Sequence, residues 1–342
     1  MTQAEATRAG TAAGEPGGTP ALQVEELSVG LRTPSGRFPV VRKVTFRVAA
    51  GRTLALLGES GCGKSMTAQA VAGLLDPVAE VTGGRVDLEG RDVLRLGRAE
   101  RRRLAGPGLA MVFQDALTAL NPVFTVGWQL AEPFRIHRGL SRREARERAV
   151  ALMERVGIPD ARSRLGSYPH QFSGGMRQRL LIAMAVALEP TVLLADEPTT
   201  ALDVTVQAQI MELLAELRTE HRMALVLITH DLGVVADHAD EVAVMYAGTV
   251  VEAGPTAEVF ARPRHPYTRG LLDSVPADGP RGGPLSSIEG SPPELARLPS
   301  GCAFRTRCPL ATERCAAESP HLVEAGPGRR VACHHAKEPS DD

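Results

Sequence analysis

The chain has 342 residues, enough to bury a full hydrophobic core and to add an extension to one domain. Hydrophobic residues make up 43% of the sequence, and the formal net charge of −1 excludes a bulk attraction to nucleic acid or anionic lipid. The longest apolar run, Leu180–Leu188, is shorter than the roughly 20 residues that span a membrane. No charged segment followed by an apolar stretch opens the sequence, so we expect no secretory signal and a cytoplasmic chain.

The first part of the chain changes from a polar segment to a pattern of strands. Residues 1–20 are rich in Gly, Ala, Thr and Pro and predict disorder. Short apolar runs at Leu22–Val24 and Val44–Val48, separated by turn residues, predict strands of an antiparallel sheet. Thr53–Leu57 is a continuous apolar run that ends at a glycine, as a buried parallel strand does.

The middle of the chain predicts a helical insertion and then an alternation of strands and helices. Residues 116–172 include Ser141 and Glu144 at capping-box spacing, which predicts a helix start. Three further buried strands are expected at 191–195, 225–229 and 242–246. Because helical patterns separate these strands, we expect a mostly parallel sheet covered by helices.

A glycine-rich segment follows the predicted strand Thr53–Leu57. Gly58–Ser65 fits the pattern G-x-x-x-x-G-K-S, in which backbone N–H groups cradle phosphates at a helix start. Lys64 would reach the β- and γ-phosphates, and Ser65 would bind Mg²⁺. A flexible loop with a stray lysine is the structural alternative. The expected nucleotide contacts are Gly58, Glu59, Ser60, Gly61, Cys62, Gly63, Lys64, Ser65 and Met66.

Two carboxylates end another predicted strand. In Leu193–Glu197, Asp196 would hold Mg²⁺, mostly through water, and Glu197 would orient and deprotonate an attacking water. His230 ends the strand 225–229 and would lie beside the same site. The alternatives are a polar strand end at the surface and a structural histidine.

A second anion site is predicted by Ser173, Gly174 and Gly175, which open a helical pattern at 176–188. Within one nucleotide pocket a second anion site is redundant, whereas across a dimer it can close over the γ-phosphate of a nucleotide bound by the partner. An ordinary helix cap is the alternative.

In this order the motifs resemble those of the ATP-binding cassette (ABC) ATPase family over residues 22–260. The corresponding family motifs are the Walker A loop at Gly58–Ser65, the Q-loop glutamine Gln114, the signature at Ser173–Met176, the Walker B carboxylates Asp196 and Glu197, the D-loop at Ala201–Asp203 and the switch histidine His230. The resemblance implies a head-to-tail dimer around two ATP molecules, with Gln114 linking the γ-phosphate and Mg²⁺ to a membrane partner. It also implies an adenine-stacking aromatic residue, for which Leu31 or Phe38 is the candidate position.

The family resemblance implies an α/β fold: a P-loop NTPase core with an antiparallel β-subdomain, a helical insertion and a small cysteine-rich extension. We expect disorder over 1–20, an ABC ATPase domain over 21–262 with a helical subdomain at about 116–179, and a C-terminal extension over 263–342.

A narrower resemblance connects the chain to the oligopeptide/dipeptide importer branch. It rests on Tyr168–Arg179, Arg264–Thr268, Gly301–Pro309 and Val331–His334. This branch implies an energy-coupling ATPase for di- or oligopeptides or a related small solute, at the cytoplasmic face of the membrane. The implied partners are a second, non-identical ABC ATPase subunit, two membrane permeases and an extracytoplasmic solute-binding protein, with no nucleic acid.

Four cysteines are concentrated in the extension: Cys302, Cys308, Cys315 and Cys333. Four thiolates can bind an iron–sulfur cluster or Zn²⁺, and the branch resemblance favours a [4Fe–4S] cluster. Reduced core thiols are the alternative without metal, and His334 or His335 could replace a thiolate at a zinc site. Because the motifs of the ATP site lie elsewhere in the chain, we expect nucleotide binding to be independent of this region.

Two other functional classes fit the sequence less well than an importer subunit does. A soluble ABC ATPase acting on nucleic acid or ribosomes usually has two cassettes or a long coiled-coil insertion, which this sequence lacks. A binding module without turnover is disfavoured by the intact Lys64, Asp196, Glu197 and His230. The arginines of the segment 95–103 are expected on a solvated helix face, because no aromatic residues are interleaved with them.

Overall fold

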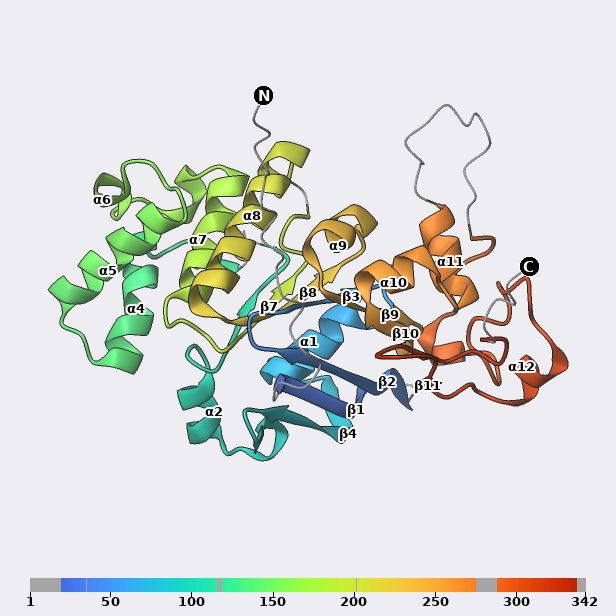
Figure 1. Cartoon of the computed structure of the whole chain (residues 1–342). Coiled ribbons are helices and arrows are strands. Elements are labelled where there is room, and N and C mark those ends of the chain that lie inside the picture. The colour runs from blue at the N-terminus through green and yellow to red at the C-terminus, as the bar shows by residue number, and fades with distance from the viewer. Residues whose placement is uncertain (1–19, 35, 116–118, 201, 275–287, 337–342) are drawn as a thin grey trace, which may run out of the picture.

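Two sheets and the helices around them form the fold (Figure 1). The structure, a computed structural model, describes residues 20–34, 36–115, 119–200, 202–274 and 288–336. The disorder predicted for residues 1–20 therefore lies outside the described residues, except for Pro20, which begins a strand.

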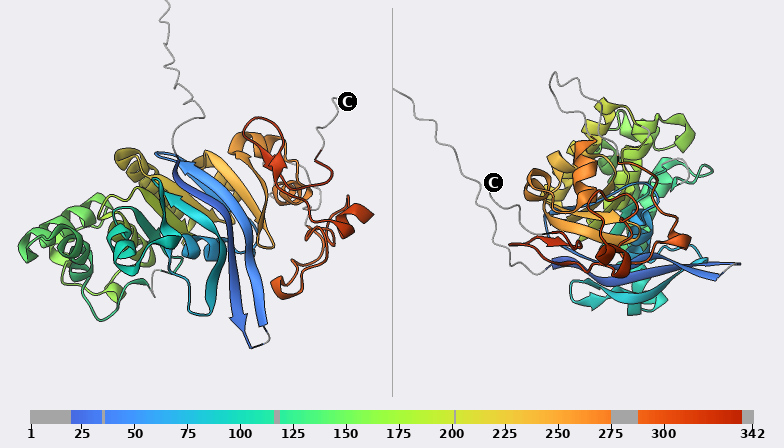
Figure 2. Two further views of the ribbon diagram at one scale, coloured as in Figure 1. Left: turned by 90° about the horizontal axis from the view of Figure 1, so that it is seen from below. Right: turned by 90° about the vertical axis from the view of Figure 1, so that its right-hand side faces the viewer.

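The antiparallel sheet has the strand order β2-β1-β4-β5. Its strands are β1 (Pro20–Thr33), β2 (Gly36–Ala49), β4 (Ala79–Leu88) and β5 (Arg91–Asp92). Leu22 of β1 pairs with Val48 on one side and with Leu88 on the other, which confirms the predicted antiparallel pairing. The hairpin of β1 and β2 extends away from the rest of the chain in Figure 2.

The main sheet has the order β11-β12-β10-β9-β3-β8-β7-β6 among the described residues. Its strands are β3 (Thr53–Leu57), β6 (Leu109–Val112), β7 (Val192–Asp196), β8 (Ala224–Thr229), β9 (Glu241–Tyr246), β10 (Thr249–Pro255), β11 (Val323–Glu324) and β12 (Arg330–Val331). The strands from β9 to β6 are parallel, which confirms the four buried strands predicted from the sequence.

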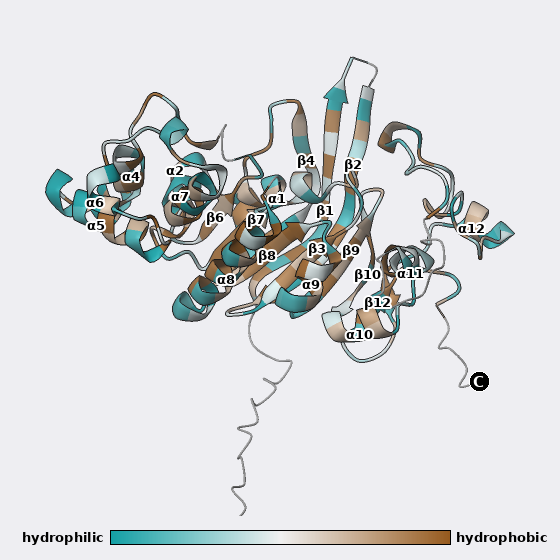
Figure 3. Cartoon of the chain, turned by 90° about the horizontal axis from the view of Figure 1, so that it is seen from above, coloured by the Kyte–Doolittle hydropathy of each residue, from teal (hydrophilic) through white to brown (hydrophobic). Residues whose placement is uncertain are grey.

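Both faces of the main sheet are buried, and this explains its continuous apolar strands (Figure 3). Successive side chains of a strand point to opposite faces. Leu54 and Leu56 of β3 therefore join a core with the antiparallel sheet and α1 (Lys64–Ala72), whereas Ala55 and Leu57 join a core on the other face. On that other face lie α9 (Leu232–His238) and α10 (Thr256–Ala261), and α8 (Val204–His221) packs beside them.

A group of helices stands to one side of the sheets. It contains α4 (Val126–Arg138), α5 (Arg142–Arg155), α6 (Ala161–Arg164), the 3₁₀ turn η2 (Pro169–Gln171) and α7 (Gly174–Val186). The predicted capping box is confirmed, because the backbone N–H of Ser141 donates to Glu144 Oε2 at 2.9 Å and Glu144 N–H donates to Ser141 Oγ at 3.3 Å. Residues 116–118 of the predicted insertion lie outside the described residues.

The chain after residue 262 is attached to the main sheet. It contains α11 (Pro266–Asp273), the 3₁₀ turn η3 (Leu295–Arg297), α12 (Glu313–Ala317) and the strands β11 and β12. β12 pairs with β10 and so continues the sheet. Tyr267 of α11 is fully buried, with its ring 4.6 Å from that of Tyr246 and 5.5 Å from that of Phe304. The extension therefore shares a core with the predicted ATPase domain.

Two further short helices precede β6: the 3₁₀ turn η1 (Val93–Arg95) and α2 (Arg98–Leu104). None of the α2 residues is buried, as expected for a solvated helix face. None of the helices in the described ranges combines the length and the hydropathy that crossing a membrane requires.

Candidate nucleotide site

A cleft of about 540 Å³ opens at the carboxyl ends of the central strands. Ligands of α/β proteins bind outside these strand ends, because the loops that follow neighbouring parallel strands converge there. The loop after β3 is 58–63, Glu197 follows β7, and His230 follows β8. The lining residues are Val40, Leu57, Gly58, Glu59, Ser60, Gly61, Gly63, Lys64, Ser65, Met66, Gln114, Glu197, His230, Leu232 and Leu271.

The glycine-rich loop, defined here as residues 58–63, is folded back on itself. The ammonium group of Lys64 donates to the carbonyl oxygens of Gly58 at 2.7 Å and Glu59 at 3.0 Å. Lys64 also begins α1, so the first N–H groups of that helix face the loop and can receive an anion. Cys62 is buried in the core and is absent from the cleft lining, although the sequence analysis placed it among the nucleotide contacts.

Gly58 cannot carry a side chain without moving the strand beside it. Its φ is 155°, and a Cβ atom there would lie 2.3 Å from the carbonyl oxygen of Met245. Gly61 also has a positive φ, of 78°, but a Cβ atom at that position would meet nothing within 4 Å. A side chain at Gly58 would therefore be opposed by a steric clash and by the backbone conformation. A side chain at Gly61 would be opposed by the backbone conformation alone.

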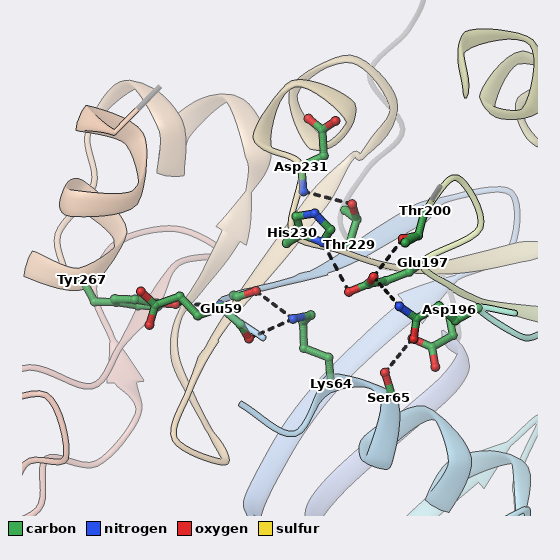
Figure 4. A network of polar contacts seen from close by, with 12 residues as sticks. Glu59, Lys64, Ser65, Asp196, Glu197, Thr200, Thr229, His230, Asp231 and Tyr267 are labelled. Atoms are coloured by element: carbon green, nitrogen blue, oxygen red, sulfur yellow. Dashed lines mark hydrogen bonds and ion pairs between the residues drawn. The ribbon is translucent and has the colours of Figure 1, made fainter. Parts of the chain in front are cut away.

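Asp196 and Ser65 meet at the floor of the site (Figure 4). Ser65 Oγ donates to Asp196 Oδ1 at 2.8 Å. Burial raises the pKa of the Asp196 carboxyl, an effect that the Ser65 hydrogen bond opposes and the Glu197 charge reinforces. A buried carboxylate next to a hydroxyl supplies the oxygen ligands that Mg²⁺ prefers, so this pair fits a magnesium ion.

Glu197 is held by three side chains from different parts of the chain. Its Oε2 accepts hydrogen bonds from Gln114 Nε2 and Thr200 Oγ1, each at 2.9 Å, and its Oε1 lies 3.3 Å from His230 Nδ1. Glu197 has a φ of 44°, an uncommon conformation for a residue other than glycine and one found at functional sites. The structure thus brings together the predicted Gln114, Glu197 and His230, and it adds Thr200, which the sequence analysis missed.

The predicted second anion site lies away from this cleft. Ser173 caps α7 by accepting a hydrogen bond from Met176 N–H at 3.3 Å, and Asp203 caps α8 by accepting one from Val206 N–H at 2.9 Å. A Cβ atom on Gly175 would lie 2.7 Å from Val206, so the starts of α7 and α8 are neighbours. Ser173, Gly174, Gly175 and Asp203 do not line the described cleft, and Ala201 lies outside the described residues.

Neither candidate for adenine stacking lies in the cleft. Leu31 and Phe38 pair with each other across β1 and β2, and both are absent from the lining described above. The apolar side chains that do line it come from Val40, Leu232 and Leu271. Only the placement of strands and helices brings these three together, so motif spacing gave no signal for them.

The extension contacts the glycine-rich loop, a connection that the sequence analysis did not anticipate. Glu59 N–H donates to Tyr267 Oη at 2.9 Å. Arg307 Nη1 and Nη2 donate to the two Glu59 carboxylate oxygens at 2.7 and 3.0 Å. Burial by itself would lower the pKa of the Arg307 guanidinium, but the hydrogen bonds and charge of Glu59 outweigh it and hold that pKa above its ordinary value.

The four cysteines of the extension lie near one another without forming a defined metal site. Cys302 N–H donates to the Cys315 carbonyl at 2.8 Å, and His335 contacts both Cys315 Sγ, at 3.6 Å, and Cys333 Sγ, at 3.4 Å. Burial raises the pKa of the Cys302, Cys308 and Cys333 thiols. Within the described ranges no three His, Cys, Asp or Glu side chains are grouped as metal ligands, so the cluster stays a prediction.

A glycine-rich loop between a parallel strand and a helix, with a carboxylate pair at the end of another strand of the same sheet, defines a P-loop ATPase. The antiparallel sheet and the helical group beside it are features of the ABC type. Residues 41–200 match the family described as ABC transporter, and residues 251–315 match the family described as Oligopeptide/dipeptide transporter, C-terminal region.

Relatives match over nearly their whole length. The dipeptide transport ATP-binding protein DppD of Escherichia coli (strain K12) is 47% identical over 94% of this chain and 97% of its own. The oligopeptide transport ATP-binding protein OppD of Salmonella typhimurium is 49% identical over 91% and 92%. A dimeric, post-hydrolysis structure of the ATP-binding cassette MJ0796 with ADP and Pi superposes with a TM-score of 0.62, at 26% identity, over 69% of this chain and 98% of that one. This chain belongs to the ABC transporter family.

The two loop glycines provide a matched test of the close backbone approach. Gly61→Ala is expected to lower the free energy of unfolding by about 1–2 kcal/mol, the cost of a left-handed backbone. Gly58→Ala should cost about 1–3 kcal/mol more, because its Cβ atom also collides with the β9 backbone. Denaturant unfolding of both variants measures the difference. Equal losses would contradict the described packing of the loop.

Proposed function

We propose that the chain is the ATP-hydrolysing, energy-coupling subunit of an ABC importer for dipeptides or short oligopeptides. The observation that carries the hydrolytic part is the Glu197 carboxylate, held by Gln114, Thr200 and His230 at the mouth of the cleft. The match of residues 251–315 to a peptide-transporter region and the names of the relatives support the cargo class.

The glycine-rich loop and the start of α1 bind the triphosphate in this proposal. N–H groups of the loop and helix face the phosphates, and the Lys64 ammonium moves its hydrogen bonds from the Gly58 and Glu59 carbonyls to phosphate oxygens. Ser65 and Asp196 would hold Mg²⁺, which neutralises charge on the phosphates. The remaining contacts would come from Glu59, Ser60, Gly61, Gly63 and Met66, and Cys62 would act through its backbone.

Glu197 acts as general base toward the attacking water. Its carboxylate accepts a proton from the water while Gln114 and Thr200 hold the other oxygen in place. His230 lies beside Glu197 Oε1, opposite Gln114 and Thr200. In this proposal it contacts the γ-phosphate. Gln114 belongs to the segment that follows β6, and it would pass the state of the site to the membrane partner.

A second ATPase subunit completes the site. Ser173, Gly174 and Gly175, with Asp203 near them, lie at helix starts that do not face the described cleft of their own chain, so they are free to close on a partner's nucleotide. The dimeric solved cassette is consistent with such pairing. We propose a related, non-identical second subunit, two membrane permeases and an extracytoplasmic solute-binding protein as partners, with the chain at the cytoplasmic face of the membrane.

We also propose that Cys302, Cys308, Cys315 and Cys333 bind a [4Fe–4S] cluster, with Zn²⁺ as the alternative. Four thiols of one small extension, two of them in contact with His335, supply a donor set of the right chemistry. Burial raises the pKa of the Cys302, Cys308 and Cys333 thiols, which must lose their protons when metal binds. Metal binding would therefore release protons and draw the four cysteines together.

Removal of the base should separate binding from hydrolysis. Glu197→Gln is expected to keep ATP affinity and to lower kcat by about 10²–10⁴-fold, because the water loses its proton acceptor. Lys64→Ala is the matched comparison and should weaken ATP binding itself. The measurements are nucleotide titration, and ATPase activity with labelled-dipeptide uptake in the reconstituted transporter. Near-normal hydrolysis by the Glu197 variant would rule out its role, and hydrolysis without peptide stimulation would count against the cargo.

The in-trans role of the α7 start can be tested by blocking it. Ser173→Arg should leave ATP binding to the isolated subunit unchanged and abolish hydrolysis in the assembled complex, since the added cation obstructs only the partner's γ-phosphate site. Ser163→Arg, on the exposed helix α6, provides a control of equal charge. Loss of ATP binding by the isolated Ser173 variant would refute the in-trans assignment.

Metal content distinguishes the possible states of the extension. Protein purified without oxygen is expected to be brown, with about four irons and four sulfides per chain, as a [4Fe–4S] cluster requires. Replacing any one of the four cysteines by serine should bleach the colour, whereas Cys62→Ser should not. Colourless protein with one zinc would favour the alternative, and metal-free protein would eliminate both.

A further inference from the structure

We propose that Arg307, in the extension, is a positioning residue of the nucleotide site: by binding Glu59 it fixes the glycine-rich loop for the phosphates of ATP. The inference rests on the proposed function, because it takes this loop as the phosphate site. It adds a residue that lies outside every ATPase motif identified in the sequence.

The ion pair between Arg307 and Glu59 has a defined geometry and is largely shielded from solvent. Two parallel hydrogen bonds of 2.7 and 3.0 Å join the guanidinium to both carboxylate oxygens. The Arg307 side chain is 4% exposed and that of Glu59 is 26% exposed. A bidentate pair fixes direction as well as distance, and low exposure reduces screening by water and salt. The pair therefore constrains where the Glu59 side chain can point.

Three side chains hold Glu59, each at a different group of the residue. The carboxylate is held by Arg307, the backbone N–H donates to Tyr267 Oη, and the carbonyl oxygen accepts from the Lys64 ammonium (Figure 4 shows the last two). Tyr267 is fully buried, so its hydroxyl is a fixed acceptor. Displacement of Glu59 would therefore move a carbonyl that holds Lys64, the residue placed to reach the phosphates.

The position of Glu59 in the loop makes this contact matter for binding. Glu59 comes directly after Gly58, whose backbone is already pressed against the Met245 carbonyl, and it comes before the exposed Ser60 and Gly61. Arg307 thus holds the point where the loop leaves the core and begins to face the cleft. A loop that no longer presents its N–H groups to the phosphates would lose charge-assisted hydrogen bonds, each worth roughly tenfold in ATP affinity.

The test compares ATP affinities of full-length subunits by fluorescence or calorimetric titration. Arg307→Met is expected to raise the Kd for ATP roughly tenfold to a hundredfold, the loss of one or two charge-assisted hydrogen bonds to phosphate. Arg307→Lys should show a smaller rise, because an ammonium keeps the charge and loses the two-pronged geometry. The control is Arg314→Met, which removes an exposed arginine–glutamate pair of the same extension, Arg314–Glu318, and should leave the Kd unchanged.

A purely structural role predicts a different pattern. The double variant Glu59→Gln/Arg307→Met removes the carboxylate left unpaired in the single variant, so its thermal stability should recover while its ATP affinity stays low. In the reconstituted transporter the same variants should raise KM for ATP more than they lower kcat. Recovery of ATP affinity together with stability would overturn the positioning role.

The outcomes separate this inference from the function on which it rests. If the parent chain shows no specific ATP binding, or if Lys64→Ala binds ATP as well as the parent does, the proposed nucleotide site fails. If the parent binds ATP and folded Arg307→Met binds equally well, only the role of Arg307 fails. Should Arg307→Met not fold, Arg307→Lys and Glu59→Gln carry the same comparison, and affinities equal to that of the parent in both would overturn the inference.

Discussion

Parallel pairing of β7, β8 and β3 brings together three parts of the proposed nucleotide site. In this register Asp196 lies opposite Ile228, and Leu57 lies opposite Thr229, so the three strands end at one edge of the sheet. The glycine-rich loop, Glu197 and His230 are the residues that follow these three ends. A shift of one residue in any strand would turn its buried side chains to the other face and move its catalytic group out of reach.

The sequence predicted this arrangement well because each part has a local cause. Continuous apolar runs identified the central strands, since a sheet buried on both faces leaves no polar alternation. The capping box at Ser141 identified the start of α5, because both partners lie within four residues. Short motifs predicted Lys64 and Ser65 at a helix start and Asp196 and Glu197 at a strand end, because each motif consists of a few adjacent residues.

Contacts between distant segments were not predicted. Even the nearby contact of Thr200 with Glu197, three residues away, gave no signal, because a threonine hydroxyl in a turn has many possible partners. Val40, Leu232 and Leu271 line the cleft from three elements with no shared motif. The assumption that the extension is separate from the ATP site failed most clearly, because composition marks a change of segment and says nothing of where that segment docks.

The ion pair between Glu59 and Arg307 joins residues 248 positions apart in the chain. A ribosome adding roughly 5–20 residues per second needs about 12–50 s to cover that interval. During this time the strands β3 to β9 can emerge and pair, while Glu59 still lacks its partner. The nascent cassette thus has a period in which its parallel strands are paired and its glycine-rich loop still lacks the Arg307 contact. Nucleotide competence would then be acquired only after Arg307 has been made, later than all of the ATPase motifs.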